Sequence, residues 1–488
     1  MNRPQTSIRA FLLVLLGFAL AACATSVPRA PIDRTQLPTA AAPTGWAPPA
    51  ISQWTLPNGI QVYHVQQAHA PLVELELIFP SGGATDPKGK PGTTALMVDM
   101  LDEGTKDRSA LALSDALQRL ATDYGSDVGT DTITLSMNLL AANLAPSLEL
   151  LHAIVRTPTM PKNEFNRRKA QRAAAALANE ANPQTGQRNT LRRVLFGEGY
   201  GGHSAQGTQR SIEAITYADI KAQYTATIAP EGAAFVVVGS VQKDALNQLL
   251  TQTFGDWTGA PTAQAHPVMP DNRELHGIHL VDYPGATQSA IAVVRRDAPF
   301  DSPTYFQDQL FNRVLGGAFV SRINMNLREE KGYTYGARSV FARRKQTGIF
   351  MAYASVKSDT TLLSLLEIKR ELEGISGDNP VTEAEFSAAK NGLLLGLPGN
   401  YERMGKVASQ VHNVASFNRP ASWLSDYPKA VRAVTIANVH ASAKRAAQWS
   451  KMGIIVAGDR KQIEPELKKL GLPIHFYNAQ GLPLTEGK

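Results

Sequence analysis

The chain has 488 residues, a formal net charge of +7, 43% hydrophobic and 19% charged residues, which is the composition of a globular protein with a sizeable core. This length exceeds one ordinary domain, so we expect two domains of roughly 200 residues each. The Lys and Arg residues are scattered, and the mild basic charge therefore does not indicate a nucleic-acid-binding protein.

The N-terminus has the pattern of a secretory leader. Arg3 and Arg9 precede the apolar run AFLLVLLGFALAA, which ends at Cys23 and is shorter than the roughly 20 residues that span a bilayer. The segment LAAC resembles the lipobox of bacterial lipoproteins, whose cysteine becomes lipidated. Cys23 is the only cysteine, so no disulfide can form within the chain. We therefore expect residues 1–22 to be a lipoprotein signal peptide and Cys23 to be lipidated. The alternative is a plain cleaved signal peptide with an incidental cysteine.

A tether is expected next, over residues 23–49. This segment is rich in Pro, Ala and Thr and poor in large apolar residues, as in flexible linkers. Ala24 stands where an aspartate would retain a lipoprotein in the inner membrane, which favours the outer membrane. We therefore expect a protein on the periplasmic side of the cell envelope, lipid-anchored in the outer membrane.

The first half of the remaining chain mixes strands and helices. QVYHVQ, LVELELIF and TITLSMNLL alternate with period two and predict strands. Between them, PGTTALMVDMLDEGT (residues 91–105) predicts a short apolar helix between two glycine-containing turns. Strands that come in adjacent groups favour an α+β fold with a largely antiparallel sheet.

The second half repeats the first. Residues 215–239 align without a gap with residues 434–458, at an offset of 219. Each copy has a helical stretch, an apolar strand that ends at a glycine, and a second amphipathic helix. We infer an internal duplication, with an N-terminal domain over 50–262, a linker over 263–275 that contains Pro and small polar residues, and a C-terminal domain over 276–488.

Three segments carry a family resemblance. WTLPNGIQVYHV (54–65), LFGEGYGGHSAQGTQRSIEAIT (195–216) and VLGGAFVSRINMNLREEKGYTYGA (314–337) resemble the insulinase or pitrilysin family of zinc peptidases. The resemblance extends from about residue 50 to the end, and REEKGYTY is its most specific part. It implies two homologous α/β-roll domains of the LuxS/metallohydrolase-like class.

In that family the helix at residues 91–105 carries H-x-x-E-H, whose two histidines bind zinc while the glutamate polarises water. The resemblance places Ala95 and Asp99 at the histidines, Val98 at the glutamate and Ala176 at a further zinc-binding glutamate on a later helix. Alanine and valine cannot coordinate a metal, and Asp99 alone cannot hold zinc. We therefore expect this chain to bind no metal or other cofactor.

The histidines offer no other metal site. No histidine lies between His69 and His152, so another alignment of the helix restores no ligand. His276 and His279 are close in sequence, but LHGIHLVDY predicts a strand, in which residues i and i+3 point to opposite faces.

Arg328 and Tyr335 match the spacing of an arginine and a tyrosine that the family's C-terminal half contributes to the active site. The resemblance implies that they bind the substrate backbone and stabilise the oxyanion, because both donate hydrogen bonds. The alternative is a surface ion pair of Arg328 with Glu329 or Glu330, and Tyr335 as a core residue of a strand.

Half of an active site implies a partner. The family includes bacterial two-chain enzymes in which one chain carries H-x-x-E-H and the other the Arg/Tyr pair. We therefore expect the zinc-free subunit of a heterodimeric envelope metallopeptidase, inactive without a zinc-carrying subunit and able to bind peptide substrates. The alternative is a non-enzymatic scaffold or peptide-binding lipoprotein derived from the same family.

Overall fold

The computed structural model describes residues 46–269 and 275–484. The leader, Cys23 and most of the tether lie outside the described residues. All described residues but Trp46 belong to one compact unit, Ala47–Lys488. None of the helices in these two ranges is long and apolar enough to cross a bilayer.

The first half is built on a six-stranded sheet of order β1-β2-β8-β3-β7-β6. Only β2 and β8 pair in parallel, so the sheet is largely antiparallel, as predicted. Its strands are β1 (Ser52–Thr55), β2 (Gln61–Gln66), β3 (Leu72–Phe79), β6 (Asp123–Val128), β7 (Ile133–Leu140) and β8 (Ala234–Gly239). Along most of β7, buried residues alternate with more exposed ones, because successive side chains of a strand point to opposite faces.

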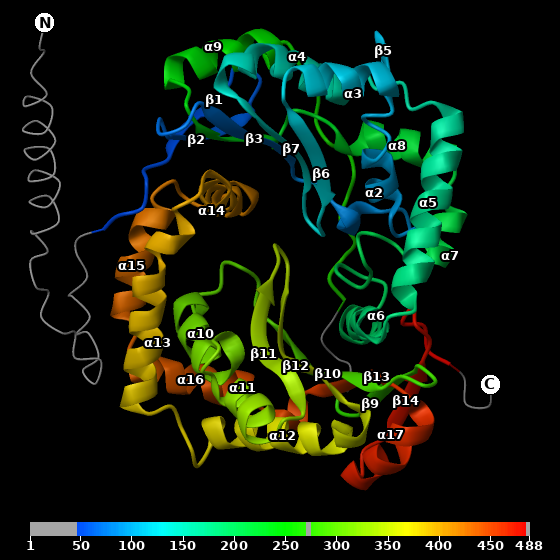
Figure 1. The fold of residues 1–488 in the computed structure, drawn as a ribbon, viewed down its shortest axis with the longest axis vertical. Helices are drawn as coiled ribbons and strands as arrows, with labels where there is room; N and C mark the ends of the chain where they lie inside the picture. Colours follow the sequence, from blue (N-terminus) through cyan, green and yellow to red (C-terminus); the bar gives the residue numbers. More distant parts are fainter. Residues whose placement is uncertain (1–45, 270–274, 485–488) are drawn as a thin grey trace, which may run out of the picture. The chain divides into compact units, whose positions relative to one another are not determined.

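Helices pack on the sheet and close the first hydrophobic core. Figure 1 shows three of them, α3, α4 and α9, above the outer face of the sheet. The helices of this half are α2 (Thr93–Val98), α3 (Ala110–Arg119), α4 (Leu144–Arg156), α5 (Lys162–Glu180), α6 (Pro183–Phe196), α7 (Gln209–Ala214), α8 (Tyr217–Thr227) and α9 (Lys243–Phe254). A short hairpin, β4 (Gly104–Thr105) and β5 (Arg108–Ser109), precedes α3.

The second half has a sheet of order β11-β12-β10-β13-β9-β14. Its strands are β9 (Ile278–Asp282), β10 (Gln288–Asp297), β11 (Thr334–Arg343), β12 (Gly348–Lys357), β13 (Gly453–Gly458) and β14 (Ile474–Tyr477). Its helices are α10 (Tyr305–Asn312), α11 (Arg322–Asn324), α12 (Thr361–Ser376), α13 (Glu383–Gly396), α14 (Met404–Ser416), α15 (Trp423–Ala433), α16 (Ile436–Ala446) and α17 (Arg460–Leu467). Two π-helical turns, η3 (Arg313–Gly317) and η4 (Met325–Glu330), flank α11.

The two halves have the same construction. Both bounds of α8 and of β8 recur 219 residues later, in α16 and β13. Thr216 and Thr435 each form a capping box at the start of the corresponding helix, which satisfies backbone N–H groups that the helix leaves unpaired. The two sheets share the order of five strands and differ at one edge, where β1 is antiparallel to β2 and β14 is parallel to β9. This agreement confirms the inferred duplication.

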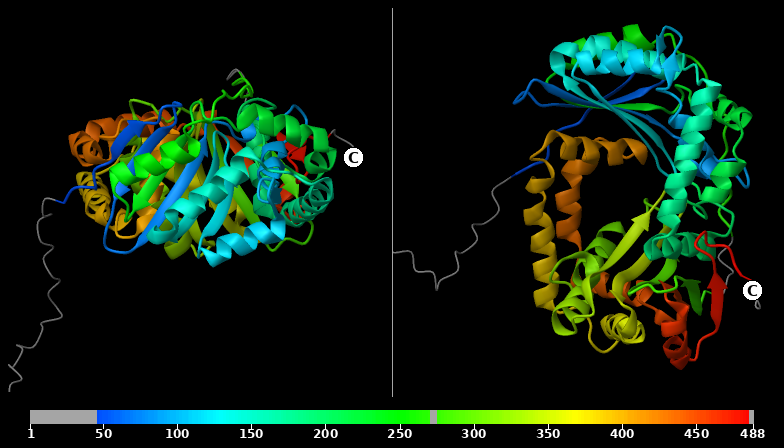
Figure 2. Two further views of the ribbon diagram at one scale, coloured as in Figure 1. Left: turned by 90° about the horizontal axis from the view of Figure 1, so that it is seen from above. Right: turned by 45° about the vertical axis from the view of Figure 1, so that its right-hand side comes forward.

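One helix of each half packs on the sheet of the other half. Val407, Val411 and Val414 of α14 belong to a buried cluster with residues of β2, β3 and β8. Conversely, α6 contributes to a buried cluster with residues of β10, β12 and β13. The bounds of α6, shifted by 219 residues, nearly coincide with those of α14, so the exchange is reciprocal (Figures 1 and 2). The two halves therefore share part of their cores.

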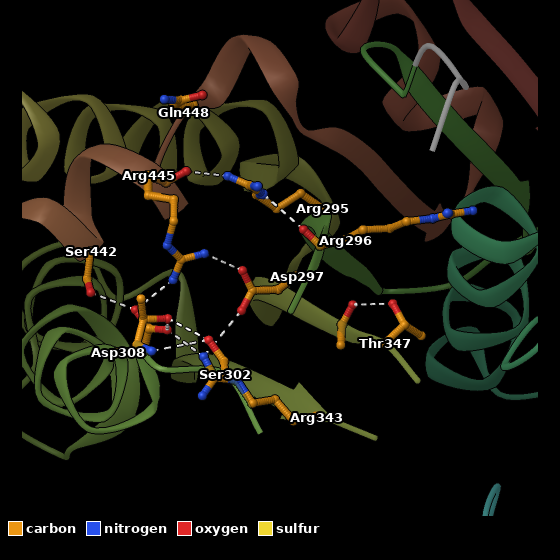
Figure 3. Close-up of polar contacts among 12 residues, drawn as sticks. Arg295, Arg296, Asp297, Ser302, Asp308, Arg343, Thr347, Ser442, Arg445 and Gln448 are labelled. Atoms are coloured by element: carbon orange, nitrogen blue, oxygen red, sulfur yellow. Dashed lines mark hydrogen bonds and ion pairs between the residues drawn. The ribbon is translucent and has the colours of Figure 1, made fainter. Parts of the chain in front are cut away.

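A buried ion-pair network holds the second half together (Figure 3). Asp308 of α10 is fully buried and contacts Arg343 of β11 and Arg445 of α16. Arg445 also lies 2.5 Å from Asp297 of β10, and Ser442 donates to Asp308 at 2.6 Å. Each buried carboxylate thus has charged partners, as burial of a charge requires.

Candidate functional site

The helix at the family's zinc position is present as a fold element. α2 begins after Gly92, whose φ of 94° favours glycine. The Asp86 carboxylate accepts hydrogen bonds at 2.7 Å from the backbone N–H groups of Gly92 and Thr94 and from the Thr94 hydroxyl. Burial raises the pKa of Asp86 to about 6, against the opposing effect of these hydrogen bonds. Asp86 therefore positions the start of α2 and satisfies its free N–H groups.

Two of the four positions assigned to the zinc motif are core residues. Ala95 is 1% and Val98 is 2% exposed, and both pack in the core of the first half. Asp99 follows α2 as its C-cap and is partly exposed. Ala176 lies on α5 and packs against the edge of the same core.

An arginine occupies the space beside Asp99. Arg172 of α5 contacts the Asp99 carboxylate through Nη2 at 2.7 Å and Nε at 2.8 Å. The same guanidinium lies 3.4 Å from the Ala95 carbonyl oxygen and donates to Gln206 at 2.8 Å. Arg172 is not among the site residues that the sequence predicted. It stands four residues before Ala176 on α5, and this spacing places two residues on one helical face.

These residues do not fit zinc. Ala95, Val98 and Ala176 have no ligand atom, and the only carboxylate of the set is paired with a cation. Elsewhere in residues 46–269 and 275–484, no group of three or more His, Cys, Asp or Glu side chains could hold a metal ion. His276 lies just before β9, since this strand begins at Ile278 and not earlier. His279 is buried against Tyr477 and the Leu275 carbonyl.

A cavity of about 550 Å³ remains where α2, α5 and α6 meet. We call it the α5–α6 cavity. Asp99 and Ala176 both line it, so the structure brings together two of the positions that the resemblance assigned to the zinc site. The other lining residues are mostly polar or basic, and they include Arg168, Arg172, Asn179, Glu180, Arg188, Asn189, Arg192 and Gln206.

The second candidate segment is exposed at a different place. Arg328 lies in η4, where its guanidinium is 4.7 Å from the centre of the Phe319 ring and 3.2 Å from the Glu329 carboxylate. Tyr335 is 91% exposed and lies at an irregularity of β11 between Thr334 and Ala337. The ion pair of the alternative interpretation is therefore present, but its placement of Tyr335 in the core is wrong.

The Arg/Tyr segment is separate from the α5–α6 cavity. Neither Arg328 nor Tyr335 lines that cavity. The irregular pairing at the start of β11 turns the Tyr335 side chain outward, because a bulge changes the alternation of side chains along a strand. Exposed Phe319 and Val320 lie nearby in sequence, at 52% and 77% exposure. The segment thus presents a cation, a phenol and two apolar side chains to solvent.

Both halves of the chain match models of one protein family. The family model described as "Insulinase (Peptidase family M16)" matches residues 61–205, and the model described as "Peptidase M16 inactive domain" matches residues 214–393. The chain is 22% identical over 409 residues to the "Non-peptidase homolog YmxG" of Helicobacter pylori, an alignment that covers 83% of this chain and 93% of the relative. It is 20% identical over 375 residues to an "Uncharacterized zinc protease" of Mycobacterium leprae, covering 75% of this chain and 83% of the relative.

Solved structures have the same fold. The crystal structure of a peptidase M16 inactive domain from Pseudomonas fluorescens superposes with a TM-score of 0.77 at 25% identity, covering 84% of this chain and 98% of that chain. A protease from Helicobacter pylori superposes with a TM-score of 0.76 at 18% identity, covering 84% and 99%. The two family models together match most of the described residues, and the chain belongs to the insulinase family, peptidase family M16, without the ligands of that family's zinc helix.

Proposed function

We propose that this chain is the zinc-free subunit of a heterodimeric metallopeptidase of the cell envelope. It binds peptide together with a partner of the same family that carries H-x-x-E-H and the zinc, and it donates Arg328 and Tyr335 to the partner's site. One observation carries the proposal: Tyr335 is exposed and Arg328 is partly exposed. In contrast, Asp99 at the chain's own zinc position is paired with Arg172. A site without a metal has no use for oxyanion donors of its own.

The chemistry assigned to the pair is hydrogen-bond donation. Attack of water on a peptide carbonyl develops negative charge on its oxygen, and donors aimed at that oxygen lower the barrier by about 3–4 kcal/mol each. The Tyr335 phenol and the Arg328 guanidinium both supply N–H or O–H donors. Phe319 beneath the guanidinium limits its orientations, as cation–π contacts do.

The exposed apolar residues support a partner at this surface. Phe319 and Val320 expose large side chains beside the Arg/Tyr pair, and apolar side chains exposed beside a polar site are a common feature of protein interfaces. Among the relatives, one is named a non-peptidase homolog and one structure an inactive domain. Both names fit a chain that lacks hydrolysis of its own.

The cellular location of the complex is proposed from the leader sequence. Residues 1–22 would direct export, and Cys23 would carry the lipid that anchors the chain in the outer membrane, facing the periplasm. The scattered charge gives no reason to include nucleic acid among the partners.

The test is reconstitution with the zinc-carrying chain from the native envelope. The complex should hydrolyse peptides and carry zinc only on the partner, whereas the isolated chain should do neither. Arg328→Ala and Tyr335→Phe should each lower kcat of the complex by about 10²-fold or more. Arg338→Ala and Tyr353→Phe change the same residue types at facing positions of β11 and β12 and should leave kcat unchanged.

A complex indifferent to Arg328→Ala and Tyr335→Phe would refute the proposal, as would hydrolysis by the isolated chain at the rate of the complex. The alternative, a non-enzymatic scaffold or peptide-binding lipoprotein, predicts a stable assembly in which no subunit loses activity when Arg328 or Tyr335 is changed. The exposure of Tyr335 favours the peptidase subunit, because a scaffold gains nothing from an unpartnered phenol held at 91% exposure.

A further inference from the structure

The α5–α6 cavity is strongly basic. Four arginines line it, together with the carboxylates of Asp99 and Glu180. Large apolar side chains do not fill the α5–α6 cavity. Its volume of about 550 Å³ lies within the range of small-ligand sites.

Both carboxylates of the cavity have partners within the chain. Asp99 is paired with Arg172. Glu180 accepts hydrogen bonds from the backbone N–H of Gln209 at 2.8 Å and from the side-chain amide of Gln480 at 3.0 Å. Of the arginines on α5, Arg168 contacts buried Glu103 just outside the cavity lining. Both partners of Glu180 are neutral, so it keeps its charge, but neither carboxylate forms an ion pair with the remaining two arginines among the described residues.

Those two arginines, Arg188 and Arg192, lie one turn apart on α6. Arg188 makes a single 3.2 Å hydrogen bond to the Thr185 hydroxyl and no ion pair with a described residue. Arg192 is partly buried and has neither a hydrogen bond nor an ion pair to any residue in the described ranges. Burial, together with the charges of Arg344 and Arg188, lowers the pKa of Arg192 to about 10. Its guanidinium has no anion beside it among the described residues, and a bound carboxylate would add charge-assisted hydrogen bonds to it.

We propose that the α5–α6 cavity binds a carboxylate group of the peptide substrate through Arg188 and Arg192. Arginine presents N–H donors in a planar fork that matches the two oxygens of a carboxylate. The side-chain amide of Asn179 also lines the cavity and can bond to peptide backbone. The carboxylate is either the peptide's C-terminus or an acidic side chain, and the experiment separates the two.

This inference rests on the peptide-binding part of the proposed function but needs no partner chain. It is tested by calorimetric titration of the isolated chain with three N-acetylated octapeptides that share a neutral sequence. One has a free C-terminus, one a C-terminal amide, and one an amide and an internal glutamate. Inorganic phosphate is the fourth titrant. At least one carboxylate-bearing peptide should bind about tenfold more tightly than the neutral amide, since a hydrogen bond to a charged group contributes about that much.

Two charge-matched variants locate the site. Arg188→Ala with Arg192→Ala should remove the preference for the carboxylate. Arg193→Ala with Arg210→Ala removes the same charge at a neighbouring cavity that they line and should change affinity less than twofold. Because Arg188 is exposed, the single Arg188→Ala variant should keep its fold, as circular dichroism can verify, and it should lower the affinity partly. Arg192→Lys keeps the charge without the fork and should bind with intermediate affinity.

The inference is overturned if the three peptides bind equally, if phosphate alone binds, or if both double variants lose affinity to the same extent. Preference for the free C-terminus identifies the C-terminal carboxylate as the ligand, and preference for the glutamate peptide identifies a side chain. If the Arg188/Arg192 variant keeps its peptide preference while Arg328→Ala abolishes hydrolysis by the complex, the cavity inference fails and the proposed function stands.

Discussion

Restoring the family's zinc motif should not restore zinc binding while Arg172 is present. The variant combines Ala95→His, Asp99→His and Ala176→Glu, which return the three zinc ligands, with Val98→Glu, which returns the glutamate that polarises water. In the native chain the Arg172 guanidinium lies within 2.8 Å of the Asp99 carboxylate and 3.4 Å from the Ala95 carbonyl oxygen. It therefore occupies the volume between the helices that a metal ion would need.

The size of the effect follows from charge repulsion. Two unit charges about 4 Å apart interact with about 4 kcal/mol at an effective dielectric constant of about 20, so a guanidinium and a dication repel by about 8 kcal/mol. The side chain can retreat toward Gln206, its other partner, which reduces this cost. We expect Arg172 to weaken zinc binding by at least about 10³-fold, a loss of roughly 4 kcal/mol.

The assay compares this variant of four substitutions with and without Arg172→Leu. Zinc content is measured by elemental analysis after equilibration against a chelator of intermediate affinity, and circular dichroism reports folding. The variant with five substitutions, including Arg172→Leu, should bind one zinc ion. The variant with four substitutions should bind none under the same conditions. Equal zinc affinity of the two would refute the electrostatic reasoning. Because Val98 is buried, Ala95→His with Asp99→His alone, again with and without Arg172→Leu, provides a milder version of the same comparison.

Two stability predictions follow from single contacts. Burial disfavours the charged form of Glu385, but the hydrogen bonds from Arg322 and Thr382 have the larger effect and lower the pKa of Glu385 to about 2. The charged Glu385 therefore stabilises the folded state fully above its unfolded pKa of about 4.5, and this stabilisation is lost as the pH falls toward 2. Glu385→Gln should therefore lower the free energy of unfolding, measured with denaturant, by about 1–2 kcal/mol at pH 7, allowing for solvent screening, and by much less at pH 2.5. An equal loss at the two pH values would contradict the role of the charged Glu385. Leu195→Ala on α6, at a fully buried position against the second sheet, should cost about 2–5 kcal/mol and lower the stability of both halves in one unfolding transition. Two transitions, with only one of them shifted, would show that the halves unfold separately.

Much of the fold could be predicted because its signals are local. Period-two alternation identified β2, β3 and β7, and the repeat at an offset of 219 predicted that β8 and β13 correspond. Both depend on which side chains a short segment must bury, and neighbouring residues in the chain carry that information. The resemblance to the insulinase family depended on similar local segments and is confirmed by the family models.

The candidate site was predicted less completely. The four replaced zinc positions could be assigned one by one, but the Asp99–Arg172 pair joins residues 73 positions apart, and no local pattern indicates such a contact. The same holds for Arg188 and Arg192. In the sequence they are ordinary charges of an amphipathic helix, and only the position of α6 beside α5 makes them line one cavity.

The sequence by itself determined that the chain is duplicated, that each copy mixes strands and helices, and that no H-x-x-E-H motif is present, because these properties belong to single segments. Only the tertiary structure decided that α6 and α14 each pack on the sheet of the other half and that an arginine lies beside the former zinc position. The physical reason is the same for both. Apolar surfaces are buried and charges are paired by whichever groups the completed fold brings together, even when those groups are far apart along the chain.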